Sequence, residues 1–470
     1  MMHDLVIIGA GPGGYVAAIR AAQLGMNVVI VDKRGKAGGT CLNVGCIPSK
    51  ALLHSSHKYW SALYDFDKYG ITCEGVDIDI QKMMGHKDAV VNDLTSGIAF
   101  LFKKNNIQFI EGHASLKKNP EGVAVHVNAS SGDVHLLKAH HILIATGSEP
   151  IEIPGLPFDE IKILSSTGAL SLGEPPRHLV VIGGGYIGLE LGSVWKRLGS
   201  DVTVIEATDD IVMTMDSDVR EALKKSLKNL GISFKFNRKI VGYRAHEGKQ
   251  HLQLLATNET LEKEEMMSCD AVLVAVGRRP HTQNLGLEEA GVESDDRGFI
   301  RVNRHYQTSL PGVYAIGDVI GGMMLAHKAE EEGIAVVESM KGQAGHVNYG
   351  VIPAVIFTQP EVASVGLTET QAKEKHTVKV GKFPMTANSL AKATGYTEGF
   401  VKIIADAKTD RVLGVHCVGA QAGAMIAEAA MAMEFGASSE DIARTCHAHP
   451  TMSEAMKEAA LETFSKAIHK

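Results

Sequence analysis

The sequence lacks long apolar runs, a surplus of basic residues and a large complement of cysteine. No run of about 18 apolar residues occurs, so we expect no transmembrane helix. The net charge of −7 at pH 7 disfavours nucleic-acid binding, because nucleic-acid-binding proteins usually carry a basic surplus. Six cysteines among 470 residues are too few for a disulfide-rich scaffold. The remaining composition, 45% hydrophobic and 21% charged, is that of a globular chain long enough for about three domains.

The N-terminus leaves little room for a targeting segment. The first strand-like run, Leu5–Ile8, begins almost at Met1. We therefore expect neither a signal peptide nor a transit peptide in this chain. The expected location is the cytoplasm, or an organelle matrix if the chain is a processed form.

Glycine, by contrast, is abundant. It accounts for 49 of 470 residues, about a tenth of the chain against a usual ~7%. Neither a Gly-X-Y repeat nor a Gly/Ser tract explains the excess. Glycine is therefore expected singly, at positions where the backbone must turn or approach another group closely.

A dispersed repeat explains part of this glycine. Leu5–Ile8 is followed by GAGPGG and Leu179–Ile182 by GGGYIG, and in each copy a helical stretch and a second strand come next. Asp32 or Glu206 ends that second strand, 18 residues after the last glycine. In this context GxGxxG predicts a dinucleotide-binding turn: the first glycine turns tightly, the second admits a pyrophosphate, and the third allows close helix–strand packing. The glycines concerned are Gly9, Gly11 and Gly14 in the first copy and Gly183, Gly185 and Gly188 in the second.

The two acidic residues are expected to accept hydrogen bonds from ribose hydroxyls. Glu206 also discriminates between cofactors, because a 2′-phosphate would place about two negative charges beside a carboxylate. No arginine occurs in residues 207–217 to receive such a phosphate. The second site is therefore predicted to prefer NAD over NADP.

A second pair of similar segments helps to divide the chain into domains. The runs at 140–150 and 269–280 each read as a buried parallel strand that ends in glycine. The tail has expected strands at 354–357, 399–404 and 412–418 and an expected helix at 423–435, without a phosphate-type glycine loop. The predicted fold is α/β, with two Rossmann-like dinucleotide-binding domains and a C-terminal α+β domain. The predicted domains are 1–147 and 148–276, which bind the first and second dinucleotide, 277–346, which completes the first, and 347–470, for association.

Two of the cysteines form a candidate redox pair. Cys41 and Cys46 lie five positions apart in GGTCLNVGCIPSK, where Gly45 relieves the loop and Pro48 marks the start of a helix. A zinc site would need four ligands, and no second Cys/His pair of suitable spacing lies nearby. A helix N-terminus stabilises a thiolate, which is the species that attacks disulfides. A redox-active disulfide is the better interpretation, and each remaining cysteine is expected to be a buried small hydrophobic residue.

Taken together, these motifs resemble those of the class I pyridine nucleotide–disulfide oxidoreductases. The resemblance rests on the cysteine segment, both glycine turns, the two buried strands and the AIGD segment at 315–318, and it covers essentially the whole chain. It implies a flavoprotein that holds FAD in the first site and NAD in the second. It further implies oxidation of protein-bound dihydrolipoyl groups to lipoyl groups with NAD⁺. The implied partners are the lipoyl domains and acyltransferase core of a 2-oxo acid dehydrogenase complex, or a glycine-cleavage lipoyl carrier.

The resemblance also implies individual cofactor contacts. Cys46 would lie beside the flavin, and Cys41 would be the interchange thiol. Lys50, one helical turn after Cys46, would lie near the flavin and pair with Glu190. Further flavin contacts are implied for Gly9, Gly11, Gly14, Asp32, Thr146, Gly147, Ser148, Asp318, Met324, Leu325, Ala326 and His327. Further NAD contacts are implied for Ile182, Gly183, Gly185, Tyr186, Gly188, Glu206, Ile240 and Gly277.

The tail holds a candidate acid–base pair in TCHAHPTMSEAMKEAA. Pro450 keeps the preceding backbone extended, and Glu454 lies in the helix that follows, within reach of the His449 ring. A carboxylate-oriented imidazole beside a thiol is an acid–base arrangement. The resemblance implies that His449 reaches the flavin site of the partner subunit, and hence a functional homodimer. Cys446 and the neighbouring histidines offer too few ligands for a metal, so no metal site is expected.

Three alternatives are weighed against this interpretation. A glutathione-reducing member of the same family would use NADPH, against Glu206, and would carry arginine where this chain has Ile19. A mercuric-ion-reducing member would need a vicinal cysteine pair near its C-terminus, which FSKAIHK lacks. A non-catalytic flavin- and NAD-binding subunit would not require Cys41, Cys46, His449 and Glu454 together.

Overall fold

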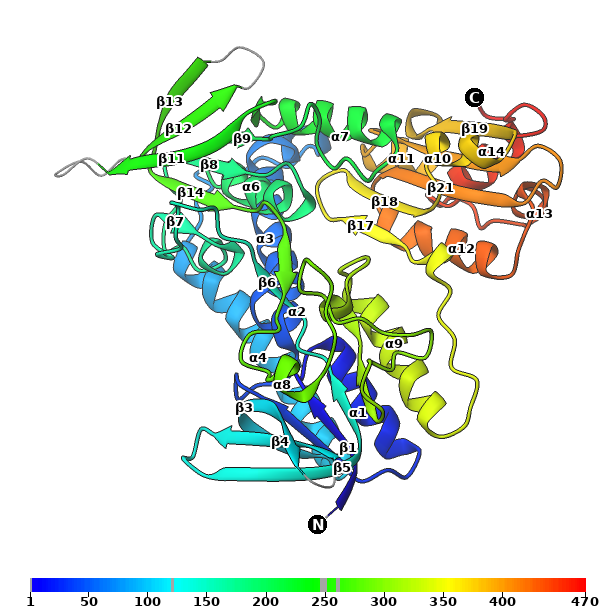
Figure 1. Cartoon of the computed structure of the whole chain (residues 1–470). Helices are drawn as coiled ribbons and strands as arrows, with labels where there is room; N and C mark the ends of the chain where they lie inside the picture. Colours follow the sequence, from blue (N-terminus) through cyan, green and yellow to red (C-terminus); the bar gives the residue numbers. More distant parts are fainter. Residues whose placement is uncertain (1, 120–121, 246–251, 259–262) are drawn as a thin grey trace. The chain divides into compact units, whose positions relative to one another are not determined.

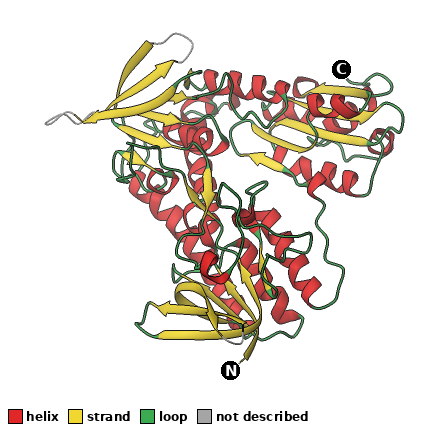
Figure 2. Cartoon of the chain, viewed as in Figure 1, coloured by secondary structure: helices red, strands yellow, loops and turns green. Residues whose placement is uncertain are grey.

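The computed structural model describes residues 2–119, 122–245, 252–258 and 263–470 (Figures 1 and 2). The chain folds into two compact units. Unit 1 consists of Met1–Leu52, Ile78–Ile151 and Gly277–Val347, and unit 2 of Leu53–Asp77, Glu152–Val276 and Asn348–Lys470. Among the described residues, no helix is long and apolar enough to cross a membrane.

Unit 1 is built on a parallel sheet whose strand order is β3-β2-β1-β5-β16. Residues of β1 alternate between two hydrophobic clusters: Leu5 and Ile7 join one, and Val6 and Ile8 join the other. A sheet buried on both faces needs this continuous apolar sequence. An additional strand, β4, pairs antiparallel with β3 and β5. The strands are β1 Met2–Ile8, β2 Val28–Asp32, β3 Gln108–Asn119, β4 Gly122–Ala129, β5 Val134–Ile144 and β16 Val313–Ala315.

Two helices of unit 1 pack unusually closely, α1 (Pro12–Gln23) and α9 (Ala326–Met340). A Cβ atom at Gly13 would lie 2.9 Å from the carbonyl oxygen of Ala329, and one at Gly333 would lie 2.6 Å from that of Gly13. Both distances are shorter than a van der Waals contact, so glycine is required on each helix. The longest helix of the unit is α4, Ile80–Lys104.

The first part of unit 2 repeats the parallel arrangement. Its sheet has the order β10-β9-β8-β14-β7, with every pair parallel. A three-stranded antiparallel sheet, β11-β12-β13, is a separate layer of the same unit. The elements are β7 Ile163–Leu164, β8 His178–Ile182, α6 Tyr186–Arg197, β9 Asp201–Ile205, α7 Ser217–Asn229, β10 Ser233–Lys235, β11 Lys239–Ala245, β12 Leu252–Asn258, β13 Lys263–Cys269 and β14 Ala271–Val274.

The C-terminal part of unit 2 is an antiparallel sheet with the order β17-β18-β21-β20-β19. Helix α12 packs on β18 and β21, and α14 packs on β19 and β20. The three strands and the helix expected in the tail are confirmed, as is the overall fold class. The elements are β17 Ala354–Ile356, β18 Glu361–Gly366, α10 Glu369–Lys375, β19 Val378–Pro384, α11 Ser389–Thr394, β20 Phe400–Asp406, β21 Val412–Gly419, α12 Ala422–Glu434, α13 Ser439–Arg444 and α14 Glu454–Glu462.

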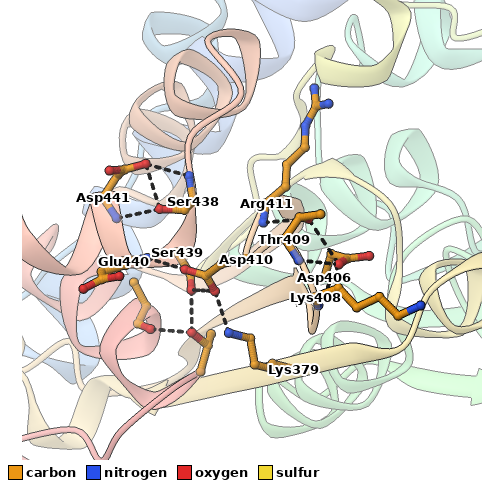
Figure 3. Close-up of polar contacts among 12 residues, drawn as sticks. Lys379, Asp406, Lys408, Thr409, Asp410, Arg411, Ser438, Ser439, Glu440 and Asp441 are labelled. Atoms are coloured by element: carbon orange, nitrogen blue, oxygen red, sulfur yellow. Dashed lines mark hydrogen bonds and ion pairs between the residues drawn. The ribbon is translucent and has the colours of Figure 1, made fainter.

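A polar network fixes α13 to the turn between β20 and β21 (Figure 3). The carboxylate of Asp410 accepts hydrogen bonds from Lys379 Nζ at 2.7 Å, Ser439 Oγ at 2.6 Å and the Glu440 N–H at 3.0 Å. A capping box between Ser438 and Asp441 begins the helix. These bonds satisfy backbone groups that a helix N-terminus otherwise leaves unpaired.

The four isolated cysteines divide evenly. Cys269 and Cys417 are buried, as expected, and burial raises the pKa of each thiol to about 12. Cys73 and Cys446 are exposed, so the expectation of burial is wrong for them. Cys73 lies in a loop before α4, and Cys446 lies in the irregular segment after α13, where no sheet or helix covers the side chain.

Candidate functional site

The first glycine turn joins β1 to α1 in unit 1. Gly9 has a φ of +104°, and a Cβ there would overlap the carbonyl oxygen of Ala145 at the end of β5. A Cβ at Gly14 would overlap the carbonyl oxygen of Gly9. The fold itself therefore requires the first and third glycines. Gly11 is different, since the nearest atom to its Cβ position is the Gly39 Cα at 3.8 Å.

The second turn, between β8 and α6, has the same division of roles. Gly183 has a φ of +107°, and a Cβ there would overlap the carbonyl oxygen of Ala275. A Cβ at Gly188 would lie 2.5 Å from the Gly183 oxygen. A Cβ at Gly185 would have no protein atom within 4 Å, and its φ of −80° suits any residue. Glycine at this position keeps the start of α6 open to a group outside the chain, which fits a dinucleotide pyrophosphate.

The two acidic residues fix their glycine loops to the neighbouring strand. Asp32 accepts the Ala10 N–H at 2.7 Å and the Arg34 N–H at 2.8 Å. Glu206 accepts the Gly184 N–H at 2.6 Å and the Thr208 N–H at 2.9 Å. An ionised carboxylate has about four acceptor positions, so each can still accept a bond from a ribose hydroxyl.

One basic residue near Glu206 lies outside the segment that sequence reasoning considered. The Arg238 N–H donates to the Glu206 carbonyl at 3.0 Å. Its guanidinium donates to the Phe236 carbonyl at 3.2 Å and lies 3.6 Å from Glu265. Because Arg238 is already paired with Glu265, its presence does not weaken the argument for NAD.

The segments at 146–148 and 317–320 come together in unit 1. Ser148 Oγ donates to Asp318 at 2.5 Å and accepts from Arg278 Nε at 2.7 Å, while Arg278 Nη2 donates to the Ser148 carbonyl at 2.6 Å. Thr146 Oγ1 donates to the His281 carbonyl at 2.7 Å. Sequence reasoning missed Arg278, although it follows Gly277 directly in the second buried-strand motif.

The remaining predicted cofactor residues lie on several elements. Tyr186 is the first residue of α6 and 41% exposed, whereas Glu190, one turn later, is buried and accepts the Phe357 N–H at 2.9 Å. Ile240 is buried in a hydrophobic cluster with Leu254, so packing alone accounts for it. Met324 and Leu325 precede α9, whose first residues are Ala326 and His327. Ile182 ends β8, and Gly277 lies between β14 and β15 (Arg278–Pro280).

The cysteine pair lies where two helices meet in unit 1. Cys41 is on α2 (Gly39–Val44), and Cys46 is the first residue of α3 (Cys46–Tyr64), as predicted. A Cβ at Gly45, between the helices, would lie 2.8 Å from the Thr40 carbonyl oxygen. A hydrogen bond with Cys46 and burial raise the pKa of Cys41, whereas the Lys50 ammonium acts to lower it. The Cys46 sulfur is therefore placed where a helix dipole favours the thiolate.

A carboxyl group that sequence reasoning missed lies near Cys41. Burial raises the pKa of Glu330, and this side chain in turn acts to raise the pKa of Cys41. The Tyr15 hydroxyl donates to Glu330 at 3.5 Å, and burial together with Glu330 raises the pKa of Tyr15 to about 12. Glu330, Glu331 and Glu332 are consecutive, and no sequence signal shows that the first faces α1, the second solvent and the third a buried Lys328.

The predicted acid–base pair is formed in unit 2. His449 Nδ1 lies 2.9 Å from Glu454 Oε1, and the Thr451 N–H donates to Glu454 Oε2 at 2.9 Å. The His449 side chain is 67% exposed, so its other ring nitrogen can meet a group outside this chain. The neighbouring His447 bonds to Glu428 at 2.6 Å. Within the described ranges no group of three or more His, Cys, Asp or Glu side chains could hold a metal ion.

Known proteins match this chain over nearly its whole length. The pyridine nucleotide-disulphide oxidoreductase family model matches residues 3–333, and the dimerisation domain of the same oxidoreductases matches residues 352–460. The mitochondrial dihydrolipoyl dehydrogenase of Pisum sativum is 53% identical, covering 99% of this chain and 92% of that protein. The dihydrolipoyl dehydrogenase of Trypanosoma brucei brucei is 52% identical over 99% and 98%, and a leghemoglobin reductase of Glycine max is 52% identical over 99% and 88%.

Solved structures agree with this assignment. The crystal structure of LpdA from Mycobacterium tuberculosis matches with a TM-score of 0.90 and 25% identity, covering 97% of this chain and 99% of that one. The matched family models together span the glycine turns, the cysteine pair and the histidine–glutamate pair described above. The chain belongs to the pyridine nucleotide-disulphide oxidoreductase family.

Proposed function

We propose that this protein is a flavoenzyme that oxidises protein-bound dihydrolipoyl groups to lipoyl groups, with NAD⁺ as the electron acceptor. The observation that carries the proposal is the Cys41–Cys46 pair at the start of α3, in the same compact unit as the first dinucleotide turn. Relatives at 52–53% identity that bear the name dihydrolipoyl dehydrogenase support this substrate over glutathione.

The chemistry divides between the cysteine pair and the histidine. His449 of the partner subunit removes a proton from one substrate thiol, and the resulting thiolate attacks Cys41 Sγ of the Cys41–Cys46 disulfide. Cys46 leaves as a thiolate, and a mixed disulfide joins the substrate to Cys41. The second substrate thiolate then closes the lipoyl disulfide and releases Cys41, so two electrons now reside on the cysteine pair. Bound FAD supplies the route by which this electron pair passes to NAD⁺.

The residues that would hold the cofactors follow the two glycine turns. FAD fits unit 1, on the Gly9–Gly14 turn, Asp32 and the Ser148–Asp318 contact. NAD fits the Gly183–Gly188 turn and Glu206. We accordingly assign 1–147 and 277–346 to FAD binding, 148–276 to NAD binding and 347–470 to association. His449 and Glu454 are the proposed base and its orienting acid.

We further propose a homodimer that serves a 2-oxo acid dehydrogenase complex or a glycine-cleavage lipoyl carrier, in the cytoplasm or an organelle matrix. The match of residues 352–460 to a dimerisation domain supports the dimer. The names of the plant relatives, which include the word mitochondrial, support the matrix location.

The test is NAD⁺-dependent turnover with dihydrolipoamide, compared with NADPH-dependent reduction of oxidised glutathione. We expect turnover with dihydrolipoamide and NAD⁺ only, and bleaching of the flavin absorbance when dihydrolipoamide is added without oxygen. Equal kcat/KM for NADH and NADPH in the reverse direction would refute the role given to Glu206. An unchanged spectrum would favour a non-catalytic flavin-binding subunit.

A further inference from the structure

A pocket in unit 2 shares no lining residue with either glycine turn. Its volume is about 240 Å³, and its walls come from the second half of α3, the end of α6 and three loops of the C-terminal part. Trp60 and Tyr396 supply aromatic surface, and the charged residues include Arg197, Lys68 and Glu398. The pocket is large enough for a small organic ligand but not for a dinucleotide.

Arg197 is the unusual member of this pocket. It is the last residue of α6 and only 4% exposed. Among the residues that the structure describes, none makes a hydrogen bond or ion pair with its guanidinium. Burial lowers the pKa of Arg197 to about 10, so the side chain stays charged at neutral pH. A mostly buried charge without a carboxylate partner is unfavourable, and the partial negative charge at the end of α6 offsets only part of that penalty.

His57, which also lines the pocket, has an unsatisfied ring nitrogen. Its Nδ1 is buried and has no hydrogen-bond partner in the described part of the chain. Burial and the nearby Arg197 guanidinium lower the pKa of His57 to about 4, so the ring is neutral at physiological pH. A neutral imidazole can present an N–H at Nδ1, and it then donates to an acceptor beside Arg197.

The other charged groups in the pocket already have partners. Asp65 accepts from Lys68 Nζ at 3.1 Å, and Glu398 accepts from Ser226 Oγ at 3.3 Å. Burial raises the pKa of Glu398, and its bond comes from the neutral Ser226 hydroxyl rather than from a cation. Burial is the only cause of the Arg197 pKa shift, so neither carboxylate is close enough to pair with its guanidinium.

We propose that this pocket binds a small oxyanion, a carboxylate or a phosphate, through the guanidinium fork of Arg197 and the Nδ1–H of His57. Arginine suits this role because its planar fork matches the two oxygens of either group, and low local polarity strengthens the contact. Trp60 and Tyr396 limit the ligand to a few heavy atoms beyond its anionic group. The inference is independent of the reaction proposed above, since binding is measured without turnover.

The test is calorimetric titration of the FAD-loaded protein with inorganic phosphate and with succinate, at constant ionic strength set with chloride. NAD⁺ is present in excess, so that the glycine turn of unit 2 is not available to the anion. We expect one saturable site per chain for at least one of the two probes, and the probe that binds distinguishes phosphate from carboxylate as the preferred group.

Three variants make the test specific. Arg197→Met should weaken the affinity about tenfold or more, because it removes a charge-assisted bond. His57→Phe, which retains a ring of similar size, should also weaken the affinity for the anion. It provides the test if Arg197→Met fails to fold. Lys196→Met removes a positive charge from the neighbouring position of α6, which does not line the pocket, and should leave the affinity unchanged. The proposal is overturned if neither probe shows saturable binding, or if both pocket variants bind as the wild type does.

Discussion

At the scale of single residues, the two cysteines of the pair differ in their surroundings. Cys46 begins a 19-residue helix, whereas Cys41 is on a short helix with its pKa raised by its bond to Cys46 and by burial. The position of Cys46 at the start of α3 is the one at which a helix N-terminus favours a thiolate. The proposed scheme accordingly gives Cys41 the exchange with substrate and Cys46 the transfer of electrons onward.

Cys41→Ser is expected to abolish dihydrolipoamide oxidation while leaving the bound flavin spectrum in place. The serine hydroxyl cannot form the mixed disulfide through which substrate electrons enter. Steady-state turnover and the visible spectrum measure the two properties. Cys446→Ser changes an exposed thiol outside the pair and should behave as the wild type. Undiminished turnover in Cys41→Ser would refute the scheme.

Glu454→Gln is expected to lower kcat by about 10²–10⁴, since the carboxylate orients the His449 ring and stabilises its charged form. Burial alone would raise the pKa of Glu454, but bonds from the Thr451 N–H and His449 leave it lowered. The carboxylate is therefore ionised throughout the neutral range, and Glu454 loses its charge only as the pH falls below about 4. Glu462→Gln, at the end of the same helix, is the control. A kcat within a factor of two of wild type for Glu454→Gln would exclude an orienting role.

At the scale of elements, the glycine turns show that one motif serves two purposes. The first and third glycines are needed for the strand and helix to pack closely, whereas the middle glycine is not needed for that packing. The fold and the cofactor site should therefore respond to different substitutions within six residues. The second turn allows a direct comparison, because Gly185 and Gly188 lie three residues apart at the start of α6.

Gly188→Ala is expected to destabilise the protein by about 1–3 kcal/mol, since its Cβ would press on the Gly183 oxygen and the Val181 side chain. Gly185→Ala is expected to keep the wild-type Tm and to raise the KM for NAD⁺ by about tenfold, because its Cβ would meet the cofactor rather than the protein. Thermal unfolding and steady-state kinetics separate the two effects. The account fails if Gly185→Ala lowers Tm as much as Gly188→Ala does.

At the scale of the whole molecule, a buried ion cluster joins the two parts of unit 2. Lys402 of β20 is 1% exposed, and its Nζ lies 2.8 Å from Asp216, 3.1 Å from Asp218 and 2.7 Å from Glu369. Asp216 also caps α7, and Glu369 begins α10. One ammonium thus holds the nucleotide-binding part to the antiparallel sheet. The charges satisfy one another, so the removal of any one should be costly.

Lys402→Met is expected to destabilise unit 2 by about 3–5 kcal/mol at pH 7, because it leaves the buried Asp216 carboxylate without its cation. The matched control is Lys382→Met, which removes a 43%-exposed partner of Asp218 and should cost less than about 1 kcal/mol. Urea midpoints of the FAD-loaded protein measure both. Equal midpoints for the two variants would contradict a structural role for the cluster.

The stabilisation that the same cluster provides should depend on pH in the acid range. Bonds from Lys373 and Lys402 lower the pKa of Glu369. Burial acts to raise the pKa of Asp216, but it does not cancel the effect of Lys402, so this pKa is also lowered. A pKa below its unfolded value means that the stabilisation is complete above about pH 4 and is lost as the pH falls through the folded pKa. The gap in urea midpoint between wild type and Lys402→Met should therefore narrow below about pH 4, and a constant gap would contradict this assignment.

Much of the fold and of the site could be predicted from sequence. The glycine turns, the acid that ends each second strand and the Cys41–Cys46 spacing are local patterns, and each is set by what the backbone must do within about 30 residues. The same holds for His449 and Glu454, which are five residues apart and meet across a single turn. Exposure of Cys73 and Cys446 could not be predicted, because cysteine has no local signal that distinguishes a buried site from an exposed one.

Contacts between distant segments were decided only by tertiary structure. Three consecutive glutamates occupy three environments, because α9 packs one face on α1, and Glu330 thereby comes near Cys41. Arg238 meets Glu265, Arg278 meets Ser148, and Lys402 meets Asp216 across 27 to 186 positions of sequence. Among the described residues Arg197 has no carboxylate partner, for the same reason: burial and pairing depend on which elements pack together, and that is a property of the whole fold rather than of any local pattern.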